Sequence, residues 1–268
     1  MGTHRIHAGG VVCLLVLFVL AAAFGPPAAL AKKVRIPRAA KMHEYDPLLE
    51  VGDTRIYWIT QKVWGIENVE GTDAWAGFTE ERVAGPFDRN GREDVFKLYS
   101  PGLYQEYYTV KRRTRLIHEI HTGSATYVFK KPLKHRRKMR FGRTYKRKSV
   151  YQYTDLDGEL EDTWVIRKEE LTAERGREWS GEFLDFEDTI VVTSDYVERS
   201  GDGLNHWNGD STTRYARGIG PVMIEDEWVY SYTIYTIFGT YRIGYRDTME
   251  LAYARIGGVE YGDPTVAD

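Results

Sequence analysis

Long hydrophobic runs are almost missing from this chain of 268 residues, and the one that exists lies near its start, over residues 11–24. Its 14 residues fall short of the roughly 20 that a membrane-spanning helix needs. Pro26-Pro27 would break a continuation, and Ala29-Leu30-Ala31 has the small-x-small pattern that signal peptidases read. We therefore expect residues 1–31 to be a cleavable signal peptide. With no further apolar run, the mature protein should be exported and soluble, in the periplasm or outside the cell.

Cysteine is also nearly absent, because Cys13 is the single one and lies near the start of the apolar run. A lipid-modified cysteine would lie at the end of such a run, so a lipoprotein is not expected. If Ala31 is the last residue removed, the mature chain begins at Lys32 and has no cysteine. It then needs no disulfide and offers neither a thiolate nucleophile nor a thiolate metal ligand.

Motifs of the common enzyme classes are missing too. The sequence has no Gly-x-Ser-x-Gly elbow, no phosphate-binding loop and no Gly-x-Gly-x-x-Gly ahead of a helix. His118 and His121 are three residues apart, which places them on opposite faces of a strand rather than around one metal ion. The oxygen-rich loop 202–210 lacks the residue order of a calcium loop. We therefore expect no metal, no cofactor and a non-catalytic protein.

Short runs that alternate polar and apolar residues make up most of the mature chain. Gly, Asn-Gly and Asp-Gly separate these runs at the spacing of hairpins. The clearest runs are Val229–Phe238 and Tyr241–Ile256, and Glu169–Arg177 is the best candidate for a short helix. The pattern predicts an all-β protein with one large curved antiparallel sheet, a half-barrel or open barrel, and short helical segments at most.

Turn residues and polarity set the expected boundaries. Residues 32–45 should be a flexible N-terminal arm, residues 46–261 a single β domain and residues 262–268 a tail. Turns are expected at three pairs of residues that tolerate positive φ: Asn90-Gly91, Asp157-Gly158 and Asn208-Gly209.

One segment carries a resemblance to a known group of proteins. Tyr215-Ala216-Arg217-Gly218-Ile219-Gly220-Pro221-Val222 follows the pattern Tyr-Ala-x-Gly-(Ile/Val)-Gly-x-Val. Together with Gly181-Glu182-Phe183 before the run at Thr189, it resembles exported bacterial β-sheet proteins of uncharacterised function, although Pro221 stands where an aliphatic or polar residue is more usual. Such proteins are similar in architecture to periplasmic lipoprotein carriers, whose half-barrel wraps an acyl chain, and that likeness concerns fold alone.

The two glycines of this segment have a physical interpretation of their own. Gly218 and Gly220, two apart, fit a β-bulge or a close approach of two backbones where a sheet bends. We therefore assign Tyr215, Gly218 and Gly220 to an architectural motif.

Charge is distributed unevenly along the chain. Residues 130–148 hold 11 Lys and Arg and no acid in 19 residues, whereas the rest of the chain has an acidic excess. Such a basic segment is either an anion-binding loop or an internal partner for the acidic residues at 155–170. The candidate contacts with an anionic surface are six of its cations: Lys134, Arg136, Arg137, Lys138, Arg140 and Arg143.

These observations lead to an exported non-catalytic protein of the bacterial envelope. It would bind an amphiphile in the concavity of its sheet, or dock to an anionic lipid, a glycan or an envelope protein. Nucleic acid is not an expected partner, because export removes the protein from it. Two alternatives stay open: a glycan-binding module that uses some of the seven Trp residues, and a hydrolase that uses paired carboxylates among Glu182, Asp185, Glu187 and Asp188.

Overall fold

The computed structural model describes residues 37–64, 72–101, 103–122, 125–154, 164–201, 205–234 and 239–267. The expected signal peptide and the expected turn at Asp157-Gly158 lie outside these residues. The residues from Arg38 onward form one compact unit.

Strands account for nearly all of the regular structure. The elements are β1 (Ala39–Lys41), α2 (Met42–Tyr45), β2 (Thr54–Trp64), β3 (Thr72–Arg89), β4 (Arg92–Ser100), β5 (Tyr104–Val110), β6 (Arg115–Thr122), β7 (Thr126–Lys134), β8 (Lys138–Arg140), β9 (Thr144–Thr154), β10 (Val165–Arg175), β11 (Trp179–Ser180), β12 (Asp185–Phe186), β13 (Thr189–Ser200), β14 (Asn205–Ala216), β15 (Gly220–Ile234), β16 (Gly239–Ile256) and β17 (Val259–Gly262).

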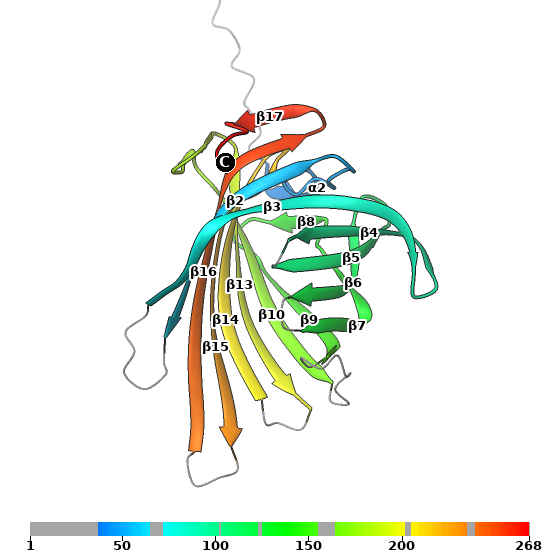
Figure 1. Ribbon diagram of the computed structural model, residues 1–268, viewed down its shortest axis with the longest axis vertical. Coiled ribbons are helices and arrows are strands. Elements are labelled where there is room, and N and C mark those ends of the chain that lie inside the picture. Colours follow the sequence, from blue (N-terminus) through cyan, green and yellow to red (C-terminus); the bar gives the residue numbers. More distant parts are fainter. Residues whose placement is uncertain are drawn as a thin grey trace, which may run out of the picture. The chain divides into compact units, whose positions relative to one another are not determined.

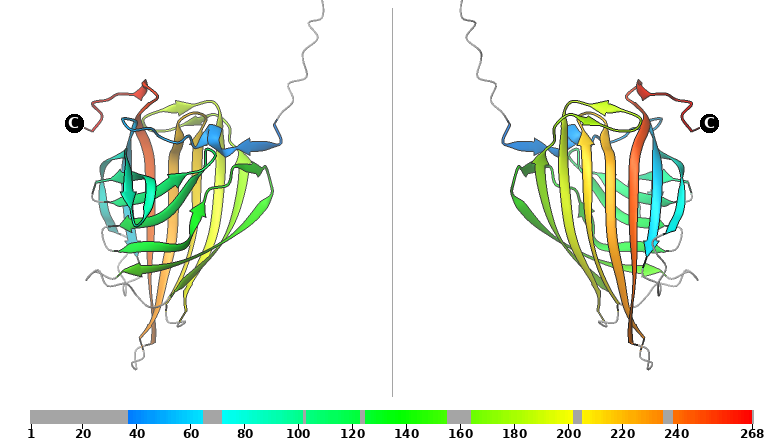
Figure 2. Two further views of the ribbon diagram at one scale, coloured as in Figure 1. Left: turned by 90° about the vertical axis from the view of Figure 1, so that its right-hand side faces the viewer. Right: turned by 90° about the vertical axis from the view of Figure 1, so that its left-hand side faces the viewer.

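The main sheet closes on itself into a barrel of 12 antiparallel strands. Its order is β15-β14-β13-β10-β9-β7-β6-β5-β4-β3-β2-β16, and β15 pairs with β16 to complete the ring, while β17 adds to β16 outside it. In Figures 1 and 2 the long strands β10 and β13 to β16 form one side of the barrel and the shorter β4 to β7 form the other. The expected all-β fold with one large curved antiparallel sheet is confirmed. We expected a half-barrel or an open barrel, and the sheet instead continues until its two ends meet.

The two-residue alternation explains why these segments are strands. Over residues 190–196 of β13 the buried side chains are Ile190, Val192, Ser194 and Tyr196, and the exposed Thr193 and Asp195 lie between them. The same alternation in neighbouring strands gives the sheet one buried face and one exposed face.

The structure corrects two local expectations from the sequence and agrees with a third. Glu169–Arg177 is not helical, because all but its last two residues belong to β10, where alternate side chains are buried. Asn208-Gly209 is not a turn but the middle of β14, where Gly209 leaves room for the ring of Tyr196 on the paired strand. By contrast, Asn90-Gly91 does turn β3 into β4, with φ of 50° and 69°.

The buried apolar residues form separate clusters around the barrel rather than one continuous core. One cluster joins Ala40 and Tyr45 to Met139 of β8 and to Ile190 and Val192 of β13. Residues 39–45, which fall within the segment expected to be a flexible arm, therefore provide β1 and α2 and pack against the barrel. β1 also pairs with β8, so the basic segment is attached to the start of the domain.

Candidate functional site

Charged side chains lie on the buried face of the sheet as well as on the exposed one. On β10 the buried-face positions are Val165, Arg167, Glu169 and Leu171. Glu169 is 5% exposed, forms an ion pair with Arg147 of β9 and accepts a hydrogen bond of 2.6 Å from Ser194 Oγ. The charges of Arg147 and Arg167 hold the pKa of Glu169 below its usual value in spite of burial.

Arg167 extends this buried cluster toward β13. Its Nη1 lies 2.7 Å from Glu198 Oε1, and its guanidinium stacks 3.8 Å above the ring of Tyr196. Tyr151 donates a hydrogen bond to the same Glu198. Charged groups, and not an apolar lining alone, therefore occupy this part of the buried face.

A second buried charge cluster joins strands β2, β3, β5 and β6. Arg55, 2% exposed, lies 3.0 Å from Glu81, and Arg115 lies 2.9 Å from Asp46 and 3.4 Å from Glu106. Burial, opposed by Arg115 and reinforced by the nearby carboxylates, raises the pKa of Glu106 to about 6. Both clusters border the hollows described next, because Asp46, Arg115 and Arg147 line them.

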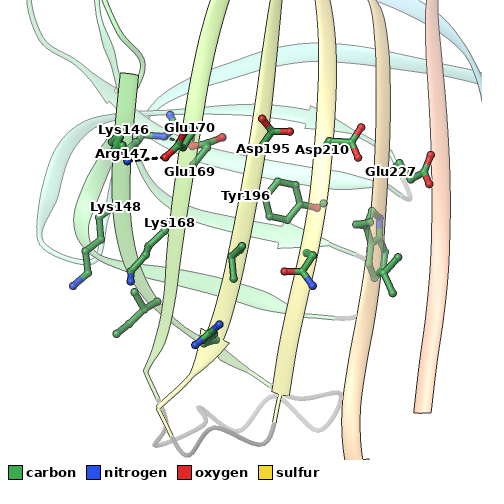
Figure 3. A pocket seen from close by; sticks show the side chains of 17 residues that line it. Lys146, Arg147, Lys148, Lys168, Glu169, Glu170, Asp195, Tyr196, Asp210 and Glu227 are labelled. Carbon is green, nitrogen blue, oxygen red and sulfur yellow. Dashed lines mark hydrogen bonds and ion pairs between the residues drawn. The ribbon is translucent and has the colours of Figure 1, made fainter. Parts of the chain in front are cut away.

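A groove of about 970 Å³, the outer groove, lies on the exposed face of β9, β10, β13, β14 and β15. Figure 3 shows Lys146, Lys148 and Lys168 on its β9–β10 side. A row of carboxylates crosses β10, β13, β14 and β15 at directly paired positions: Glu170, Asp195, Asp210 and Glu227. The groove is thus basic on one side and acidic on the other, so it does not favour a ligand of one charge.

A second hollow, the wall cleft, lies where β7 and β9 separate. Their pairing covers Thr126–Phe129 with Tyr151–Thr154, and beyond it β7 stays with β6 while β9 continues along β10. The cleft has a volume of about 840 Å³, and each charged residue among those lining it is a Lys or Arg: Lys130, Lys131, Lys134, Arg136, Lys146, Arg147 and Lys148.

Few of the cations of the wall cleft are neutralised by described carboxylates. Lys146 pairs with Glu170 at 2.8 Å, and Arg147 pairs with Glu169. Lys130 instead lies 5.1 Å from the ring centre of Trp164, and Arg136 lies over Tyr145 and donates to the carbonyl of Lys146. Both acidic residues at 155–170 that the structure describes, Glu169 and Glu170, pair with the basic segment. Residues 155–163 lie outside the described residues, so self-pairing remains an open alternative for the other cations of the segment.

A third hollow of about 300 Å³, the turn pocket, lies between α2, the β5–β6 turn and the segment before β8. The ionisable residues in its lining are Lys41, His43, Asp46, Arg112, Arg113, Arg115, His135, Arg136, Arg137 and Lys138. Burial, followed by the charge of Arg115, lowers the pKa of His135 to about 4, so its ring is neutral at neutral pH. His135 and Arg136 line both the turn pocket and the wall cleft.

Of the six cations singled out in the sequence, four line the wall cleft, the turn pocket or both. Lys134 and Arg136 line the wall cleft, and Arg136, Arg137 and Lys138 line the turn pocket. Arg140 is exposed on β8, and Arg143 lies 5.4 Å from the ring centre of Tyr145; neither lines the three hollows.

The glycine motif lies at the β14–β15 hairpin. A register shift falls between Arg214 and Tyr215, and Gly218 is in the turn with φ of 79°. Gly220 has φ of 110°, and a Cβ there would lie 2.2 Å from Arg55 Nη2. Gly220 therefore allows the buried Arg55 to reach the Ile219 carbonyl, at 2.7 Å.

The two histidines and two of the acidic residues singled out in the sequence contact neighbouring side chains. His118 hydrogen-bonds with Thr109, and His121 lies 3.3 Å from Glu119. Asp185 accepts a hydrogen bond from Ser180, and Asp188 pairs with Arg217 at 2.6 Å. Within the described ranges, no group of three or more His, Cys, Asp or Glu side chains is placed to hold a metal ion.

Comparison of the chain with models of protein families, with curated proteins and with solved structures gives no match. None of the helices in the described part of the chain is long and apolar enough to cross a membrane.

Sequence reasoning did not find the buried charge clusters. A signal was present, since Arg167 and Glu169 share the period of two with the buried Val165 and Leu171. A charged pair at apolar positions of an alternating strand indicates a buried ion pair, because an isolated buried charge is too costly.

Proposed function

We propose that the protein binds an anionic component of the cell envelope, a lipid headgroup or a phosphorylated glycan, at the wall cleft between β7 and β9. The observation that carries the proposal is the lining of that cleft, in which each charged residue is basic. Surfaces of one sign attract ligands of the opposite sign and raise their local concentration.

Most cations of the wall cleft are not neutralised by a described carboxylate. Five of its lining cations have no ion pair with a described carboxylate: Lys130, Lys131, Lys134, Arg136 and Lys148. At about 1 kcal/mol for each basic side chain near an anionic membrane, they supply about 5 kcal/mol, which corresponds to a dissociation constant of a few tenths of a millimolar. Binding of this strength is reversible and depends on salt.

The charged groups of the buried face favour a polar ligand over an acyl chain. An apolar chain lying against Arg147, Glu169 and Arg167 would remove these groups from water without replacing their hydrogen bonds, which is unfavourable. A charged headgroup held at the cleft requires no such burial, so it is the better candidate ligand.

Co-sedimentation with vesicles tests the proposal. Wild-type protein should sediment with vesicles that contain anionic phospholipid, should not sediment with purely zwitterionic vesicles, and should be released at roughly 0.5 M salt, where the Debye length is a few Å. The variant Lys131→Gln/Lys134→Gln/Lys148→Gln should bind about 100-fold more weakly, since it loses about 3 kcal/mol.

A matched control separates the cleft from net charge. The variant Arg92→Gln/Lys97→Gln/Arg177→Gln removes the same three charges at positions outside the three hollows. It should bind nearly as well as wild type. Equal loss in both variants, or binding that ignores salt, would show that the wall cleft is not the site.

A further inference from the structure

The turn between β5 and β6 has an unusual sequence for its geometry. Lys111 and Thr114 exchange backbone hydrogen bonds of 3.0 and 3.1 Å across two central residues, Arg112 and Arg113. Both central residues have positive φ, 50° and 61°. Two-residue hairpin turns of this kind strongly favour Asn-Gly, because other side chains are strained in that conformation. Two arginines at these positions therefore weaken the turn rather than support it.

Neighbouring groups hold this turn in place from outside. Arg137 donates a hydrogen bond of 3.0 Å to Thr114 Oγ1 and a second one to the carbonyl of Arg112. The turn thereby borders the turn pocket, whose lining includes both Arg112 and Arg113. Strain that is maintained by the surrounding structure is commonly found at binding sites.

The turn pocket has a strong excess of positive charge. Among the described residues that line it, Asp46 contributes the one carboxylate, and Arg115 already binds both of its oxygens at 3.1 and 2.9 Å. Arg112, Arg113 and Lys138 have no ion pair with a described carboxylate. An anion entering the pocket would therefore meet guanidinium and ammonium groups that are not yet neutralised.

We propose that the turn pocket binds a single phosphate group, free or carried on a small molecule or headgroup. Guanidinium groups match the oxygens of a phosphate in pairs, and such charge-assisted hydrogen bonds are stronger than neutral ones. The pocket volume of about 300 Å³ suits one small charged group rather than an extended polymer. This pocket shares only His135 and Arg136 with the wall cleft, and the proposal does not depend on the function proposed above.

The strained turn allows an unusually clear test. The variant Arg112→Asn/Arg113→Gly provides the residues that the turn geometry prefers, so its melting temperature without ligand should be equal to or higher than that of wild type. Inorganic phosphate and glycerol 3-phosphate should each raise the melting temperature of wild type above its value in chloride of equal ionic strength. The variant should lose this increase, and calorimetry should show phosphate binding weakened at least tenfold.

Further variants keep the outcome clear. Lys138→Gln should also weaken phosphate binding, whereas Arg92→Gln/Arg177→Gln should leave it unchanged. The wall cleft variant Lys131→Gln/Lys134→Gln/Lys148→Gln should retain the phosphate response even where it has lost binding to vesicles. The proposal is overturned if phosphate acts no differently from chloride on wild type, or if the Asn-Gly variant binds phosphate as tightly as wild type does.

Discussion

Replacing Glu81 by Gln should lower the free energy of unfolding by several kcal/mol, because Glu81 is one half of a buried ion pair. The Glu81 side chain is 7% exposed and faces Arg55, which is 2% exposed, at 3.0 Å. Glu81→Gln keeps the size of the side chain and removes its charge, so Arg55 stays charged in a buried place. Breaking a buried pair from one side typically costs about 3–5 kcal/mol.

The contacts of Arg55 narrow this range. Its Nη2 keeps the hydrogen bond to the Ile219 carbonyl, and Asp46 still attracts the charge from further away. We therefore expect the lower end, about 3 kcal/mol, out of a total stability of about 5–15 kcal/mol. For a domain of this size that corresponds to a decrease in melting temperature of about 6–12 °C.

The assay is thermal and urea unfolding of the protein followed by circular dichroism at pH 7. Glu80→Gln is the matched control, because Glu80 is the preceding residue on the opposite face and pairs with Arg82, which is 55% exposed. Its loss should cost about 0–1 kcal/mol. Adding Arg55→Met to Glu81→Gln removes the unpaired charge and should recover at least half of the lost stability. If Glu81→Gln costs no more than Glu80→Gln, or the double variant is the least stable, the buried pair does not act as argued.

Three further results are expected. Glu106 has a pKa raised to about 6 from 4.5, so the folded state holds its proton more tightly and stability falls by about 2 kcal/mol in all as pH rises from about 3.5 to about 7; Glu106→Gln should flatten urea midpoints measured over that interval, and an unchanged slope would refute the assignment. Gly220→Ala should destabilise the protein much more than Gly218→Ala. Both glycines have positive φ, but a Cβ on Gly220 would meet Arg55, whereas one on Gly218 would meet nothing within 4 Å. Equal melting temperatures of the two variants would contradict this. Far-UV circular dichroism should show sheet with little helix, and a helical content near one third would be incompatible with the fold.

The alternation of side chains was enough to predict the strands, because a period of two is a local property of the chain. Residue types in a short segment gave a wrong secondary structure where pairing with a neighbouring strand determines it. Asn208-Gly209 has the residues of a turn, but the ring of Tyr196 on the paired strand fills the space above Gly209 and keeps it in β14. Glu169–Arg177 has no Gly or Pro until its last residues, so nothing within it interrupts a helix, and its pairing on both sides makes it a strand.

The candidate site was predicted in part. The basic segment was visible as composition, but its division between the wall cleft and the turn pocket follows from the separation of β7 and β9. Arg112 and Arg113 were not singled out, because their importance comes from the positive φ of a turn whose residues do not suggest it.

Closure of the barrel has a consequence for the order in which the protein folds. The hairpins from β3 to β6 and from β13 to β16 join neighbours in the sequence and can form early. The last seam is different, since Thr60 of β2 is paired with Thr248 of β16 near the other end of the chain. Loop closure over such a separation is slow, because its entropy must be lost before the contacts form. β2 can pair with β3 early, but its other edge stays unpaired until β16 has been synthesised. We therefore expect the emerging polypeptide to stay open, and accessible to chaperones, until β16 is available.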